Sequence, residues 1–242
     1  MMMPAPSSPG FRPLEALAAL RAVLRDPDDT SQVFRLLSAM SGRTPHALAR
    51  RFGVSRPGVA LLETRPALLP RLRDREALAA LPDGSLGRAY LDFLGADGLT
   101  ADGLVEASAA GERAIDDGEA WIGDRLRDSH DLWHVVTGYR GDLLGEASLL
   151  AFTFAQTRAP GIGVLVAAAL VRAGDPDARR LIADGFFRGV RAAWLPAVAW
   201  EQLLAVDLDE VRRRLRVGPP PHYEPFFARE LAAGGLLAPR AA

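Results

Sequence analysis

The sequence predicts an all-α protein, a single multi-helix, bundle-like domain with a metal site on a helical hairpin. Apolar residues recur every three or four positions along most of the chain, glycine or proline stands at the joins, and no convincing alternating strand pattern occurs. The chain has 242 residues, and no internal repeat or low-complexity linker divides it. We therefore expect one helical domain over 14–242, preceded by a flexible tail over 1–13.

Composition limits the chemistry and the partners. The 29 basic residues, all arginine, nearly balance 30 acidic ones, so no global charge favours nucleic acid or an anionic membrane. The exclusive use of arginine is typical of a GC-rich genome and indicates a bacterial source. Because there is no cysteine, any metal must be held by nitrogen and oxygen ligands.

The first elements are amphipathic. Leucines spaced three and four apart predict a helix over 14–24, and a second follows through Val33, with Thr30 and Ser31 as N-cap candidates. The block 44–57 predicts two short helices around Gly53 and resembles a small helix-turn-helix. A solvated arginine face at the end of a bundle explains the same residues, and the balanced charge argues against DNA binding.

The remaining apolar patterns predict further helices over 73–80, 85–94, 117–136, 142–156, 178–190 and 207–215. The longest apolar run, 161–171, is about half of the roughly 20 residues that a membrane-spanning helix needs, so we expect no transmembrane segment. Residues 1–13 also lack the apolar core of a secretory signal. The run predicts a buried core helix or, together with Phe186 and Phe187, a wall for a lipid tail.

Two of the four histidines, His130 and His134, lie four residues apart in one apolar-periodic segment. On a helix they are one turn and about 40° apart, and Asp131 is about 60° from His134. The glycines of 138–141 then break the helix. Two helices joined there form a hairpin that places Glu146 level with His134.

A set of two histidines and two carboxylates suits a borderline divalent ion such as zinc or iron. Satisfied core or surface histidines explain the same spacing, so spacing alone leaves both interpretations open. Arg127, four residues before Asp131, would orient that carboxylate, meet an anionic substrate, or form an ordinary surface pair. A zincin would need glutamate in place of Asp131, and no phosphate loop or serine-hydrolase elbow occurs.

Several motifs occur in a fixed order along 81–221 and together resemble the coenzyme Q biosynthesis protein four family of mitochondria and ubiquinone-making bacteria. They are Leu81-Pro82-Asp83-Gly84-Ser85-Leu86-Gly87-Arg88-Ala89-Tyr90 with Phe93; Arg127-x-x-His130-Asp131-x-x-His134-x-x-x-Gly138; Leu144-Gly145-Glu146; Gln156-Thr157; Trp200-Glu201; Val211-Arg212; and Pro219-Pro220-Pro221. The chain departs from the family pattern at Leu150, Thr153 and Gly141-Asp142, where lysine, an acidic residue and Thr-Asn usually stand.

The resemblance implies an enzyme of ubiquinone biosynthesis that removes the C1 carboxylate of a polyprenylated hydroxybenzoate-type precursor and replaces it with hydroxyl. It implies a divalent metal, zinc with iron as the alternative, held by His130, Asp131, His134 and Glu146. Asp131 and Glu146 would be catalytic. A substrate-binding role falls to Arg127 and Gln156.

Further expectations follow from the same resemblance. The partners would be the polyprenylated aromatic precursor, other ubiquinone-synthesis proteins and a membrane surface bound peripherally, with a homodimer as one option and no nucleic acid. The expected location is the bacterial cytoplasm, at the inner membrane. A non-catalytic, lipid-binding scaffold that organises the ubiquinone-synthesis enzymes is the alternative function, in which the metal only locks the hairpin.

Overall fold

The computed structural model describes residues 10–27, 29–97, 108 and 117–226, and this part of the chain is all-helical, as predicted. Its only extended pairing is one isolated antiparallel bridge between Ser85 and Asp207. Most of the tail predicted over 1–13 lies outside the described residues. The helices, in chain order, are α1 (Pro13–Arg25), α2 (Thr30–Ala39), α3 (Thr44–Val54), α4 (Arg56–Thr64), α5 (Leu69–Arg73), α6 (Arg75–Ala79), α7 (Leu86–Asp97), α9 (Asp117–Asp128), α10 (His130–Thr137), α11 (Leu143–Thr157), α12 (Pro160–Arg172), α13 (Pro176–Arg191), the 3-10 helices η2 (Leu195–Ala197) and η3 (Trp200–Gln202), and α14 (Leu208–Leu215).

A local side chain divides one helix that the periodicity predicts as continuous, and another side chain sets a later start for a second helix. The expected helix over 117–136 is interrupted at Ser129, whose hydroxyl donates to the carbonyl of Leu126 at 3.3 Å and so competes with the helical backbone. The helix expected over 73–80 is α6, which begins later, at Arg75, because Asp74 caps it by accepting the Ala77 N–H at 2.9 Å. The break at Ser129 makes α10 a separate element that begins at His130.

Two predicted helix boundaries also shift. Helix α2 follows Asp29 rather than being capped by Thr30 or Ser31, and the Ser31 hydroxyl donates to the Asp29 carboxylate. Gly53 lies inside α3, and the break before α4 falls at Ser55, which accepts the Gly58 N–H at 3.2 Å. Serine at this place satisfies one of the free N–H groups of the first turn of α4.

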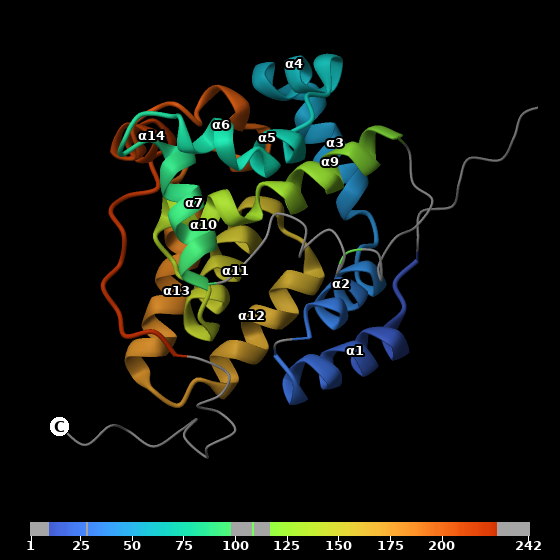
Figure 1. Ribbon diagram of the computed structural model, residues 1–242. Helices are drawn as coiled ribbons and strands as arrows, with labels where there is room; N and C mark the ends of the chain where they lie inside the picture. Colours follow the sequence, from blue (N-terminus) through green and yellow to red (C-terminus); the bar gives the residue numbers. More distant parts are fainter. Residues whose placement is uncertain (1–9, 28, 98–107, 109–116, 227–242) are drawn as a thin grey trace, which may run out of the picture.

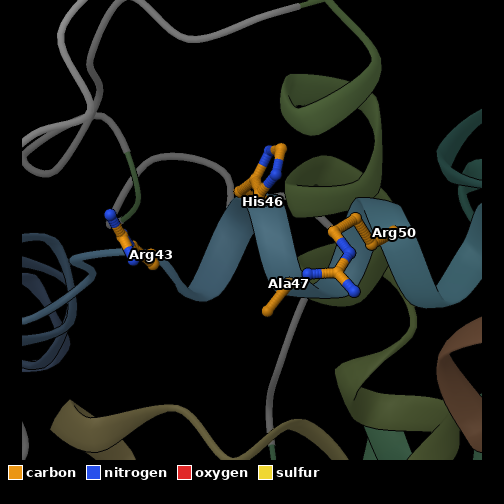
Figure 2. A pocket seen from close by; sticks show the side chains of 4 residues that line it. All are labelled: Arg43, His46, Ala47 and Arg50. Atoms are coloured by element: carbon orange, nitrogen blue, oxygen red, sulfur yellow. The ribbon is translucent and has the colours of Figure 1, made fainter.

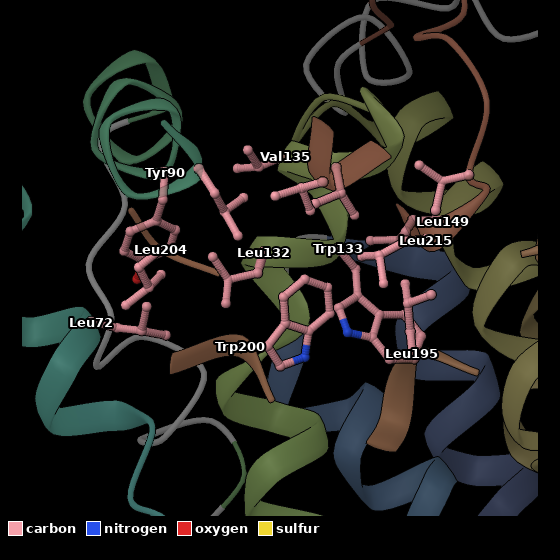
Figure 3. Packing of buried hydrophobic residues seen from close by; sticks show 14 of the residues in the cluster. Leu72, Tyr90, Leu132, Trp133, Val135, Leu149, Leu195, Trp200, Leu204 and Leu215 are labelled. Atoms are coloured by element: carbon pink, nitrogen blue, oxygen red, sulfur yellow. The ribbon is translucent and has the colours of Figure 1, made fainter. Parts of the chain in front are cut away.

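The largest apolar cluster backs α10 and contains Trp133 and Trp200 side by side, both at most 2% exposed (Figure 3). Leu132 and Val136 of α10 are fully buried in the same cluster, so the helix is held by the core along one side. Because His134 directly follows Trp133, packing of this indole against the core fixes the backbone position from which the His134 side chain extends.

A second, charged contact ties α9 to η3 behind this core. The Arg125 side chain is 2% exposed and reaches both oxygens of Glu201, at 2.8 and 3.0 Å, while donating to the Val198 carbonyl at 2.6 Å. A buried pair that is broken on one side leaves an uncompensated charge, so this contact strongly constrains the packing of α9. It explains the Trp200-Glu201 motif in structural terms.

The apolar run 161–171 forms most of α12 and is buried on one side only. Gly161, Ile162 and Leu165 are buried, whereas Val171 is 81% exposed. Helix α12 contacts α2, α11 and α13, and Figure 1 shows it beside the α1–α2 pair, away from α14. None of the described helices combines the length and the apolar character needed to cross a membrane.

Helix α13 packs closely on α11 through two glycines one turn apart. A Cβ atom at Gly185 would lie 2.3 Å from the Ser148 carbonyl oxygen, and one at Gly189 would lie 2.6 Å from that of Phe152. Residues four apart on each helix therefore meet, which is the usual ridge-to-groove arrangement. This contact holds α11, and so Glu146, in its place.

We predict that Gly185→Ala destabilises the protein by about 1–3 kcal/mol, because the new methyl group forces α11 and α13 apart. Urea unfolding followed by circular dichroism measures the change. The control is Gly123→Ala in α9, where no atom lies within 4 Å of the new Cβ, and which should gain up to about 1 kcal/mol from helix propensity. Equal unfolding midpoints for Gly185→Ala and wild type would contradict the close packing.

Candidate metal centre

The predicted hairpin is present, and a glycine and an aspartate define its turn. Helix α10 ends at Thr137 and is followed by the capping residue Gly138, which has φ of +77° and whose N–H donates to the His134 carbonyl at 2.8 Å. A Cβ atom at Gly138 would also lie 2.5 Å from Pro220, so both backbone conformation and space require glycine. Helix α11 begins after Asp142, whose carboxylate accepts the Leu144 N–H, as predicted for its cap.

Three of the four predicted ligands lie close together, two on α10 and one on α11. The Nε2 atom of His134 lies 3.2 Å from Nε2 of His130 and 3.0 Å from Oε1 of Glu146. Nε2 of His130 lies 3.7 Å from the other Glu146 oxygen. One ligand atom from each of the three residues lies within 4.8 Å of the others. The His134 side chain is 1% exposed and that of Glu146 39%, so the group is closed on one side and open on the other.

The backbone fixes which nitrogen of His134 faces this group. Its Nδ1 atom lies 3.0 Å from the Tyr139 carbonyl oxygen. Because a carbonyl only accepts, Nδ1 carries the hydrogen, and Nε2 presents its lone pair to His130 and Glu146 in the neutral imidazole. This is the arrangement by which proteins orient histidine ligands toward a metal ion.

Two arginines hold the end of α10 from outside. Arg212 of α14 donates to the carbonyls of Val135 and Val136, each at 3.1 Å, and Arg188 of α13 donates to that of Thr137 at 2.8 Å. These are free carbonyls of the last helical turn, where positive charge is also favourable. The Val211-Arg212 motif thus supports the helix that carries both histidines.

The three groups polarise one another strongly. Burial alone would lower the pKa of His134, but the charge and hydrogen bond of Glu146, with Asp131 and the Tyr139 carbonyl, raise it above its usual value. Burial would likewise raise the pKa of Glu146, but the two imidazoles hold it far below its usual range. The two pKa values therefore shift in opposite directions, because His134 and Glu146 each favour the charged form of the other.

Asp131 is half-buried beside these groups but is not one of the three that converge. Burial raises the pKa of its carboxyl, the two imidazoles lower it, and Glu146 raises it, with a net upward shift. The charges of His130, His134 and Glu146 thus act on the Asp131 carboxylate. The ligand role expected for Asp131 stays a prediction.

The two residues expected to bind substrate are both engaged within the protein. The Arg127 guanidinium contacts Asp124 at 2.8 Å and Asp128 at 2.9 Å, rather than Asp131 as the four-residue spacing suggests. The Gln156 side chain donates to the Gly189 carbonyl at 2.6 Å and accepts the Leu195 N–H at 2.8 Å. Gln156 therefore ties α11 to α13 and η2, and its contact with substrate stays a prediction.

One side chain next to the ligands was not assigned to the site from the sequence. The Phe93 ring of α7 stacks on the His134 imidazole, with centroids 5.2 Å apart and planes 20° from parallel. Phe93 is half-buried and belongs to the first family-like motif, which was the only available signal. It adds an aromatic wall beside the buried ligand.

A separate hollow of about 480 Å³ lies along α3 and is lined by Arg43, His46, Ala47 and Arg50 (Figure 2). His46 also lies 3.5 Å from Glu119 of α9. None of these four lining residues belongs to the predicted site. The two histidines of α10 and Glu146 thus form a group distinct from this basic surface.

The donor set fits a divalent ion. Three atoms that each carry a lone pair or negative charge point at one another, which is unfavourable unless a proton or a cation lies between them. Two imidazole nitrogens and one carboxylate suit zinc or iron, and three protein ligands leave further coordination positions free. His130, His134 and Glu146 are the residues that would hold the ion.

Fold and site together define a class: an all-helical protein with a two-histidine, one-carboxylate group on a helical hairpin. Residues 12–221 match the sequence profile of the family described as coenzyme Q (ubiquinone) biosynthesis protein Coq4. The chain belongs to this family.

Fungal relatives named mitochondrial ubiquinone biosynthesis protein COQ4 are similar over most of the chain. That of Pyricularia oryzae is 33% identical over 72% of this chain and 57% of its own length, and that of Neurospora crassa 31% identical over 82% and 53%. The Aspergillus fumigatus relative is 32% identical over 90% of this chain and 79% of its own length. The chain thus spans little more than half of the first two relatives. Their mitochondrial names do not support the bacterial source expected from the arginine usage, and that source and the location at a bacterial inner membrane stay predictions.

A crystal structure of a candidate ubiquinone biosynthesis protein from Nostoc punctiforme has the same fold. It covers 86% of this chain and all of the other, with a TM-score of 0.65 and 24% identity. At this identity the likeness concerns the fold alone.

We predict that lowering the pH weakens the binding of a divalent ion. The midpoint of this loss should lie at a higher pH than for a site built on an ordinary histidine. A protonated imidazole has no lone pair for the ion, and Glu146 raises the pKa of His134 above 6.5, so the proton competes from above pH 6.5 downward. In Glu146→Gln the raising charge is lost while burial remains, and the midpoint moves to lower pH. Calorimetric Zn²⁺ titrations from about pH 5 to about pH 8 measure both midpoints. An unmoved midpoint in the variant would contradict this coupling.

Proposed function

We propose that the protein acts in ubiquinone biosynthesis as a metal-dependent decarboxylase that removes the C1 carboxylate of a polyprenylated hydroxybenzoate-type precursor. Membership of the Coq4 family supports the pathway. The observation that supports a catalytic role is the convergence of His130, His134 and Glu146 in a group that is exposed on the Glu146 side. A structural zinc site has four protein ligands and is closed, whereas a catalytic one keeps a position for substrate or water.

When bound, the divalent ion, zinc or alternatively iron, supplies a Lewis acid that stabilises negative charge on substrate oxygens. Loss of CO₂ breaks the bond between C1 and the carboxylate carbon and leaves the electron pair on the ring. In this proposal the carboxyl of Asp131, whose pKa is raised by burial, donates the proton that this carbon takes up. Replacement by hydroxyl, instead of by a proton, requires molecular oxygen as co-reactant.

Other side chains position the head group in this proposal. Contact of Arg127 with the anionic carboxylate of the substrate requires its guanidinium to exchange Asp124 or Asp128 for that carboxylate. Gln156 acts indirectly, because its amide ties α11 to α13 and η2. Phe93 offers an aromatic face next to His134, against which an aromatic ring can stack.

The prenyl tail needs apolar surface, since each buried CH₂ contributes about 0.8 kcal/mol. Of the two phenylalanines predicted to contact the tail, Phe187 is 53% exposed and could do so, whereas Phe186 packs on Phe154. Peripheral membrane attachment, association with other ubiquinone-synthesis proteins, a homodimer and a bacterial cytoplasmic location belong to the proposal. A lipid-binding scaffold is the competing function.

His134→Ala tests the proposal in cells that make ubiquinone and lack their own copy of the protein. We expect a carboxylated precursor to accumulate and ubiquinone to fall by at least about tenfold, because the best-buried ligand is lost. The control is His46→Ala in α3, where the side chain is 66% exposed. Normal ubiquinone without accumulated precursor would refute a catalytic role of the cluster.

The same variants, purified and supplied with Zn²⁺ or Fe²⁺, precursor and oxygen, separate catalysis from scaffolding. Release of CO₂ by the wild type and by His46→Ala, but not by His134→Ala, supports the enzyme. Stable binding of the precursor without turnover, together with unfolding on chelation, favours the scaffold.

A further inference from the structure

The residues that follow α14, 217–226, cross the turn of the metal hairpin and are called the strap here. In Figure 1 the strap is the red segment that runs from α14 down the side of the molecule past α13. Arg188 of α13 anchors its first part by donating to the carbonyls of Val217 at 3.2 Å and Pro219 at 3.0 Å. Pro220 then lies directly against Gly138.

The hydroxyl of Tyr223 in the strap bonds to both halves of the hairpin turn. It accepts the Arg140 N–H at 2.8 Å and donates to Oδ2 of Asp142 at 2.8 Å. Arg140 directly follows Tyr139, whose carbonyl orients the His134 ring. One hydroxyl group therefore connects the backbone that holds His134 with the residue that caps the helix of Glu146.

Asp142 transmits this contact to the first turn of α11. It is 1% exposed, and its backbone carbonyl accepts the Glu146 N–H at 2.8 Å. Because both oxygens of its carboxylate accept hydrogen bonds from fixed donors, the aspartate cannot rotate without breaking several bonds. Its Oδ1 atom accepts the N–H groups of Leu144 at 3.1 Å, Gly145 at 3.2 Å and Phe226 at 2.9 Å.

The backbone of Gly145 packs closely against the Tyr223 hydroxyl, without room for a side chain. A Cβ atom at Gly145 would lie 2.5 Å from this oxygen and 2.1 Å from the Arg140 carbonyl oxygen. This glycine is thus required by its contacts with the hairpin turn and with Tyr223. The structure shows that it admits the strap and the turn, immediately before Glu146.

We propose that Tyr223 is a positioning residue of the metal centre: through Arg140 and Asp142 it sets the separation of His134 and Glu146, and the strap is required for tight binding of the divalent ion. This inference rests on the proposed function in so far as the cluster binds such an ion. It adds a residue, far from the ligands in sequence, that governs their geometry.

The test uses the full chain and Co²⁺, whose visible absorption reports coordination geometry. Tyr223→Phe keeps the ring and removes the hydroxyl. We expect its Co²⁺ affinity to fall at least about tenfold, with a changed spectrum, as for other groups that orient metal ligands. The control Ser55→Ala also removes one hydroxyl, the cap of α4, and should lose some thermal stability but no Co²⁺ affinity.

Asp142→Asn provides a second variant, which decides the outcome if Tyr223→Phe does not fold by circular dichroism. We expect Asp142→Asn to weaken Co²⁺ binding as well. The variant with both substitutions should bind Co²⁺ no more weakly than the weaker of the two single variants, because both substitutions act on the same hydrogen bond. Additive losses would overturn this route.

Two further results distinguish the inference from the function on which it rests. Wild-type affinity and spectrum in folded Tyr223→Phe would overturn the positioning role and leave the metal centre standing. Absence of Co²⁺ binding by the wild type would overturn both.

Discussion

The hydrogen bond between Nδ1 of His134 and the Tyr139 carbonyl is the interaction on which the site depends. It leaves Nε2 as the acceptor in a buried position, 3.0 Å from a carboxylate oxygen and 3.2 Å from a second imidazole nitrogen. Without that bond the ring can rotate or change tautomer, and the three groups no longer present lone pairs to a common point.

The rest of the fold keeps the two ends of this hairpin fixed. Core packing of Trp133 and the arginine contacts to the last carbonyls of α10 hold the histidine side. The glycine contacts of α13 and the bonds from the strap to Asp142 hold the glutamate side. The ligands are therefore positioned by elements that follow them in sequence by tens of residues, which explains why the family-like motifs extend beyond the hairpin.

The sequence suffices for the helical class, the hairpin and the three converging residues, because helical periodicity and a glycine-rich turn are local signals. The interruption at Ser129 depends on a side-chain bond to the backbone, which leaves no trace in an apolar pattern. The engagement of Arg127 and Gln156, and the contacts of Tyr223, arise from residues brought together by tertiary packing. Spacing along a helix indicated Asp131 as the partner of Arg127, but two nearer aspartates compete for the guanidinium.

Anomalous X-ray diffraction from crystals soaked in Zn²⁺ tests the central claim most directly. The account predicts one strong peak about 2.0–2.2 Å from Nε2 of His130, Nε2 of His134 and an oxygen of Glu146. A peak at the basic surface of α3 alone, or histidine rings that point away from each other beside an ion bound elsewhere, would contradict it.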